Sequence, residues 1–224
     1  MTPPEFDRRA VLKALTATLT ILAAGRFTPA AAAEHTADTA AASASWTVQT
    51  LEAFADTLIP GERRHPGDLP IAGAVTGPGA VQAGAVDVLT SPELPLAPLL
   101  PAIGALLDTR AAAYALTHLL LLPPTSPAFV GLPFKHRTAL VGGLFDPGDL
   151  DRQIWQVLSL MVGLAFDTAA HLDTRQALAG HHPGLAWLGF PAPDADGLWR
   201  FPQYSYGRAL ADLHPATTAS GSPA

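Results

Sequence analysis

The chain has 224 residues, with 13 lysines and arginines against 19 aspartates and glutamates. The resulting net charge of −6 repels phosphate backbones, so the composition argues against nucleic acid as a partner. The absence of cysteine excludes disulfides, thiolate metal sites, iron–sulfur clusters and covalently attached c-type haem.

Residues 1–33 have the three-part pattern of an export signal. A charged segment at residues 5–13 precedes a short apolar stretch at residues 14–24, and Ala31 and Ala33 give an A-x-A cleavage pattern. The apolar stretch is shorter than the roughly 20 residues that a spanning helix needs. We therefore expect cleavage after Ala33, with a retained membrane anchor as the alternative.

Two adjacent arginines indicate the export route. Arg8 and Arg9 are followed by a hydrophobic pair and Lys13, and the apolar stretch is only thinly hydrophobic. This combination predicts twin-arginine export, which serves folded proteins, rather than an ordinary secretion signal. We expect the protein to act outside the cell, in the periplasm or in the cell envelope, and to meet the membrane only through export.

The mature chain is expected to begin with a linker and a first helix. Residues 34–45 are small and polar, which predicts a flexible linker. Apolar residues at helical spacing then predict a helix that follows an N-cap at Thr47 and stops at Pro60–Gly61.

An irregular Gly/Pro-rich loop is predicted over residues 61–79. It carries Arg63, Arg64 and His65, which we interpret as solvated loop charges. Binding of an anion or an acidic partner surface is the alternative.

Two long helices dominate the rest of the pattern. Residues 101–122 are apolar on most sides, which predicts a helix buried at the centre, with His118 as a core histidine. Residues 146–172 predict a second long helix with one apolar face. Shorter helices are predicted near residues 80–91 and 135–145.

No useful run of strand-like alternation occurs, so the predicted class is all-α. We expect one compact helical domain at residues 46–214, with two long buried helices and long Gly/Pro-rich loops. An irregular aromatic arm at residues 181–214 and a disordered tail at 215–224 complete the prediction.

The arm is the candidate partner surface because large aromatic side chains are costly to leave in water. It either wraps its own helical core or contacts another protein. Its aromatic residues are Trp187, Phe190, Trp199, Phe201, Tyr204 and Tyr206.

Chemistry-bearing motifs are scarce. A dinucleotide-binding G-x-G-x-x-G pattern would need glycine at Gln82, and no P-loop, serine-hydrolase or H-E-x-x-H motif occurs. Asp167 and His171 are four apart on the second long helix, and His181 and His182 follow. They form a candidate metal or acid–base site, with local structural hydrogen bonding as the alternative.

Four stretches carry a family resemblance. "TLEAFADTLIPG" at 50–61, "GAVQAGAVDVL" at 79–89, "FKHRTALVGGLF" at 134–145 and "GLAWLGFP" at 184–191 resemble the small (gamma) subunit of gluconate 2-dehydrogenase. The twin-arginine signal is also similar. The chain departs from that family at "HHPGL", where many members have a Gly-Gly-Asn-type stretch, and in its close at 196–215.

The resemblance implies a non-catalytic accessory subunit with no cofactor of its own. Its partner would be a flavin-dependent oxidoreductase of the glucose–methanol–choline class, which binds FAD and does the chemistry. A cytochrome c subunit is left open, and the departures leave open whether the substrate is a sugar. The alternative is a stand-alone exported enzyme or metal protein that uses Asp167, His171, His181 and His182.

Overall fold

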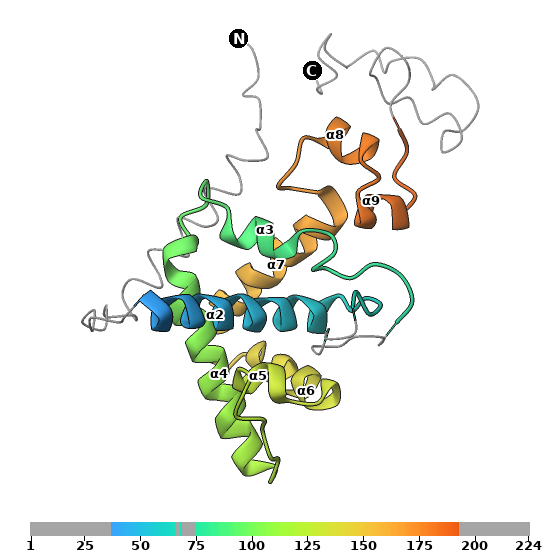
Figure 1. Cartoon of the computed structure of the whole chain (residues 1–224). Helices are drawn as coiled ribbons and strands as arrows, with labels where there is room; N and C mark the ends of the chain where they lie inside the picture. The colour runs from blue at the N-terminus through green and yellow to red at the C-terminus, as the bar shows by residue number, and fades with distance from the viewer. Residues whose placement is uncertain (1–36, 66–67, 69–74, 193–224) are drawn as a thin grey trace, which may run out of the picture. The chain divides into compact units, whose positions relative to one another are not determined.

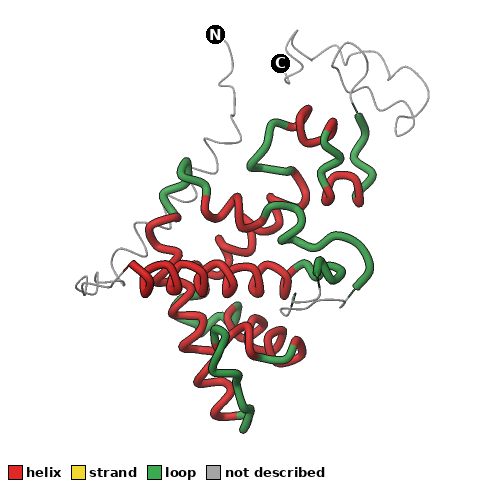
Figure 2. Tube along the Cα trace, in the orientation of Figure 1, coloured by secondary structure: helices red, strands yellow, loops and turns green. Residues whose placement is uncertain are grey.

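The structure is a computed structural model that describes residues 37–65, 68 and 75–192. Those residues form helices and loops without a strand, as Figure 2 shows, which confirms the predicted all-α class. The helices are α2 (Ala37–Leu58), α3 (Ala85–Thr90), η1 (Ala97–Leu99), α4 (Leu100–Thr117), α5 (Ala128–Gly131), α6 (Phe134–Leu144), α7 (Arg152–Thr168), α8 (Thr174–Ala179) and α9 (Pro183–Trp187). All of them belong to one compact unit that ends at Leu188.

Helix α2 is the centre of this unit. Every residue from Thr50 to Thr57 except Glu52 is buried, and α3, α4, α5, α6 and α7 all pack against the helix (Figure 1). The small side chains of Ala53 and Ala55 allow this close approach on several sides. The two helices predicted to be buried therefore surround a third that is covered more completely.

Helix α2 also begins earlier than predicted. It starts at Ala37, so the predicted linker at 34–45 is wrong from residue 37 onward, and Thr47 lies inside the helix. The segment is rich in alanine, the strongest helix former, and its continuation into a buried helix outweighs its lack of an apolar period.

Helix α4 is shorter and less buried than predicted. It ends at Thr117, and its buried face consists of Leu100, Ile103, Gly104, Leu107, Ala111 and Ala115. His118 is exposed and stacks on the ring of Tyr114, so the expectation of a core histidine is wrong. The segment Ala97–Thr117 is, within the described chain, the one helix long and apolar enough to cross a membrane by length and composition, a test that core helices also pass.

Helix α7 confirms the predicted apolar face. Ile154, Leu158, Met161, Val162 and Ala165 are all buried, and the helix packs against α2, α3 and α9. Arg110 of α4 pairs with Asp149 and with Asp151, which holds the start of α7 against α4.

The predicted irregular arm begins with regular structure. His182 starts α9, where it caps the helix by accepting a hydrogen bond from the Leu185 backbone. A Cβ atom on Gly184 would overlap the carbonyl oxygen of Phe166, so α9 lies directly on the α7 backbone. The arm at 181–214 is therefore helical at Pro183–Trp187, while most of it lies outside the described residues.

Candidate functional site

A closed neck positions the residues of the loop after α2. The Glu62 N–H donates to the Gly77 carbonyl at 2.9 Å, and the Ala80 N–H donates to the Ile59 carbonyl at 3.0 Å. Gly61 and Gly79 touch at this point, because a Cβ on Gly79 would lie 2.7 Å from the Gly61 nitrogen. The loop thus leaves and rejoins the core at one place, beside the end of α2.

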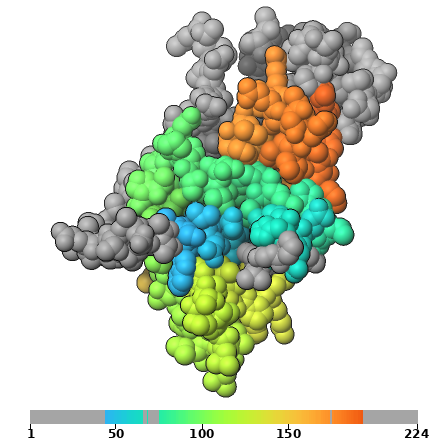
Figure 3. Space-filling view, viewed as in Figure 1, coloured from blue at the N-terminus to red at the C-terminus, as the bar shows by residue number. Residues whose placement is uncertain are grey.

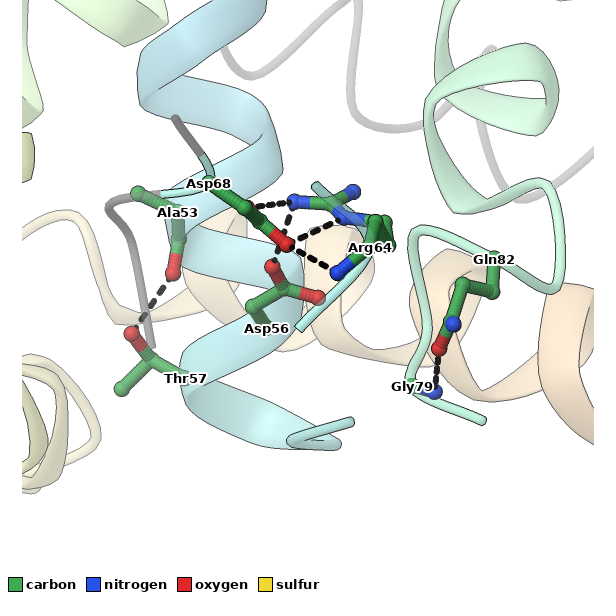
Figure 4. A network of polar contacts seen from close by, with 7 residues as sticks. All are labelled: Ala53, Asp56, Thr57, Arg64, Asp68, Gly79 and Gln82. Atoms are coloured by element: carbon green, nitrogen blue, oxygen red, sulfur yellow. Dashed lines mark hydrogen bonds and ion pairs between the residues drawn. The ribbon is translucent and has the colours of Figure 1, made fainter. Parts of the chain in front are cut away.

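Within the loop, Arg64 forms what we call the Arg64 clamp with Asp56 and Asp68 (Figure 4). Its Nε donates to Asp68 Oδ2 at 2.8 Å and its Nη2 to Asp68 Oδ1 at 2.6 Å, a two-pronged arrangement. The same Nη2 donates to Asp56 Oδ2 of α2 at 3.1 Å. Arg64 is therefore a structural cation that ties the loop to the core, and the interpretation as a solvated loop charge is wrong.

The two carboxylates of the Arg64 clamp differ in their titration. Burial raises the pKa of Asp56 to about 6, because desolvation outweighs the attraction of the Arg64 guanidinium. The hydrogen bonds from Arg64 lower the pKa of Asp68 instead. Asp56 is thus a carboxyl group that can hold a proton near neutral pH, but its side chain is almost completely enclosed.

A second buried cation lies close to the Arg64 clamp. Arg137 of α6 is only 2% exposed, and its Nε and Nη1 have no hydrogen-bond partner within the described residues. Burial lowers its pKa to about 10, and the Asp56 carboxylate opposes this shift. The sequence gave no sign of this, since "FKHR" predicts only a polar helix start.

The structure brings together two of the four residues in the predicted metal or acid–base site. The rings of His171 and His182 lie 5.8 Å apart between centroids. His182 Nε2 lies 3.0 Å from the Ala83 carbonyl oxygen, and His182 Nδ1 accepts the Leu185 N–H. Both nitrogens of His182 are therefore engaged by the backbone, which leaves neither for a metal or a proton transfer.

His171 is held in place by close packing. Its ring lies against Gly84, whose φ of 79° is the left-handed conformation and whose missing Cβ makes room for the imidazole. His171 Nδ1 is buried without a hydrogen-bond partner among the described residues, and burial lowers the pKa of the ring. This geometry fits an uncharged packing histidine.

The other two residues of the predicted site lie elsewhere. Helix α7 ends at Thr168 because Ala169 turns into the left-handed conformation at φ 49°, so Asp167 and His171 do not share a helix face. Asp167 instead lines an open, mainly apolar groove along α7, and His181 is exposed. No group of three or more such side chains in the described part of the chain is placed to hold a metal ion.

The predicted partner surface is described only at its start. Trp187 is 61% exposed, and Phe190 is exposed as well. Trp199, Phe201, Tyr204 and Tyr206 lie outside the described residues, as do Arg8, Arg9 and Lys13 of the export signal.

Comparison with known proteins adds one assignment. No curated protein and no solved structure matches the chain. Residues 45–224 match the model of DUF5987, a family of unknown function. Because this match spans most of the sequence, the chain belongs to the DUF5987 family.

Proposed function

We propose that this chain is a non-catalytic accessory subunit that binds a flavin-dependent oxidoreductase of the glucose–methanol–choline class and is exported with it. The resemblance of four stretches to the small subunit of gluconate 2-dehydrogenase supports this proposal. The twin-arginine pattern at Arg8 and Arg9 supports it too, since that route carries folded proteins and their bound companions.

The observation that carries the proposal is the presentation of Trp187 at the end of α9. A Cβ on Gly77 would lie 2.8 Å from the indole ring, so one part of the ring rests directly on the backbone of the loop. Gly77 has a φ of 100°, a conformation that glycine adopts readily. The indole is thus held in one position while most of it stays exposed, which lowers the entropy cost of using it as an anchor.

An aromatic anchor of this kind has a large expected share in binding. Tryptophan is enriched among the residues that dominate interfaces, and truncating such a residue costs about 2–4 kcal/mol. That loss corresponds to a roughly 30- to 1000-fold weaker complex. Binding would also stabilise the partner by mass action, by about 4 kcal/mol at a thousandfold excess over Kd.

The test is purification of the tagged full-length chain from its own host, with an absorption spectrum, metal analysis and mass spectrometry of the eluate. We expect a co-purifying flavoprotein, and we expect Trp187→Ala to abolish its recovery. Trp46→Ala is the matched control, because Trp46 is 44% exposed on α2 and away from α9. A chain that elutes alone with stoichiometric metal, or a flavoprotein whose recovery ignores Trp187, would overturn the proposal.

A further inference from the structure

The end of α4 is an unusually exposed apolar feature. Leu116, Leu119 and Leu121 are 78%, 92% and 99% exposed, and we call these three residues the leucine tip. The end of α4 and the loop after it reach beyond the neighbouring helices, as Figures 1 and 3 show. Single exposed leucines are ordinary, but three at one projecting end indicate a contact surface.

The backbone at the leucine tip is strained to hold this arrangement. Helix α4 closes with the Leu119 N–H donating to the Leu116 carbonyl at 3.3 Å and the Leu120 N–H donating to the Ala115 carbonyl at 2.9 Å. This is a Schellman turn, in which the residue at the position of Leu119 is usually glycine. Leu119 adopts the required left-handed φ of 53°, which costs a leucine free energy that glycine would not lose. The fold thus accepts both strain and exposure at one residue.

The same turn leaves few unpaired backbone donors at the leucine tip. The N–H groups of His118, Leu119 and Leu120 are all hydrogen-bonded, and Pro123 and Pro124 have no N–H. An apolar medium requires this, because it offers nothing to an unpaired backbone group. Water or a polar protein surface imposes no such requirement.

The charges around the leucine tip favour an anionic surface. Although the chain is acidic, it has no aspartate or glutamate between Asp108 and Asp146. The ring of His136 lies 6.0 Å from that of His118, which brings the start of α6 beside the end of α4. The exposed Lys135 therefore lies next to the leucines.

From these observations we propose that the leucine tip docks on an anionic lipid surface. The three leucines enter the boundary between head groups and acyl chains, and Lys135 meets the lipid phosphates. This contact is peripheral and does not require α4 to cross the membrane. It uses residues far along the chain from Trp187, so it does not rest on the proposed function.

The test measures binding of the purified full-length chain to sedimented vesicles of phosphatidylglycerol and phosphatidylcholine, or of phosphatidylcholine alone. We expect binding to the mixed vesicles that weakens with salt, and weaker binding to phosphatidylcholine. Leu119→Gly should weaken binding about tenfold, since a leucine leaves the interface. It should also raise the melting temperature by about 2–4 °C, because the turn loses its strain.

Two further variants complete the experiment. Leu150→Ala is the matched control, because Leu150 is 80% exposed but lies beside the start of α7, and its binding should equal that of the natural chain. Lys135→Gln should weaken binding to the mixed vesicles only. The proposal is overturned if neither vesicle binds the chain at millimolar lipid, or if Leu119→Gly binds as well as the natural chain. It is likewise overturned if Leu119→Gly loses only the flavoprotein of the co-purification experiment, because the leucine tip would then contact a protein.

Discussion

Replacing Arg64 with methionine tests whether the Arg64 clamp holds the loop to the core. The guanidinium makes two hydrogen bonds to Asp68 and one to Asp56, and hydrogen bonds to charged groups contribute about 1.5–3 kcal/mol each. A simple sum overestimates the loss because one nitrogen serves both carboxylates. The variant also leaves two buried carboxylates without their cation, which costs about 3–5 kcal/mol. We expect a loss of about 4 kcal/mol at pH 7.5.

The loss should depend on pH in a defined direction. Because the folded-state pKa of Asp56 is about 6 against 3.8 for the ordinary group, its protonated form favours the fold, and stability falls as the pH rises from about 4 to 6. Without Arg64 both carboxylates are harder to ionise, so the variant loses most above pH 6. Near pH 4.5 protonation neutralises Asp56, and the difference from the natural chain should shrink.

The assay is urea unfolding of the full-length chain at pH 7.5 and pH 4.5, followed by circular dichroism. Arg64→Lys is the control that keeps the charge but loses the planar fork, and we expect it to fall between the natural chain and Arg64→Met. If Arg64→Met stays within about 0.5 kcal/mol of the natural chain at pH 7.5, Arg64 is a solvated loop charge and the reasoning fails.

Two further substitutions test the packing of the core. Arg137→Met should stabilise the chain by about 1–3 kcal/mol, because the buried guanidinium has unpaired donors that methionine lacks. A loss of stability in urea unfolding would mean that water or a ligand satisfies those donors in solution. Gly184→Ala should cost about 3 kcal/mol, because the new methyl group collides with the Phe166 carbonyl. Its control is Gly163→Ala, where the space is open and thermal unfolding should show a small gain; similar effects of the two substitutions would contradict the close contact of α9 with α7.

The local signals in the sequence predicted the helices better than their ends. The apolar face of α7 and the stop at Pro60–Gly61 followed from spacing and from the chemistry of proline. The end of α4 did not, because Leu119 through Leu122 continue the apolar run past Thr117. The helix ends where Leu119 adopts a left-handed conformation, and no residue there is one that normally marks a helix end.

The candidate site was harder to predict because its partners are distant in sequence or hidden by ordinary patterns. Asp56 lies on what looks like the polar side of α2, and only the folded loop brings Arg64 to it. The histidine pair was predicted from four residues, but the left-handed Ala169 separates Asp167 from His171, and the backbone takes both nitrogens of His182. The Arg64 clamp and the role of His182 both depend on tertiary contacts that spacing alone does not encode.

The central position of α2 has a consequence for synthesis. Its buried stretch Thr50–Thr57 is covered in part by α7, which is complete only at Thr168, roughly 110 residues later. At about 5–20 residues per second, the ribosome needs roughly 5–20 seconds to add those residues. During that time the most enclosed helix of the finished protein has no complete cover, so the nascent chain exposes aggregation-prone surface until translation is nearly finished. Cellular factors that bind apolar segments have their best opportunity within this interval.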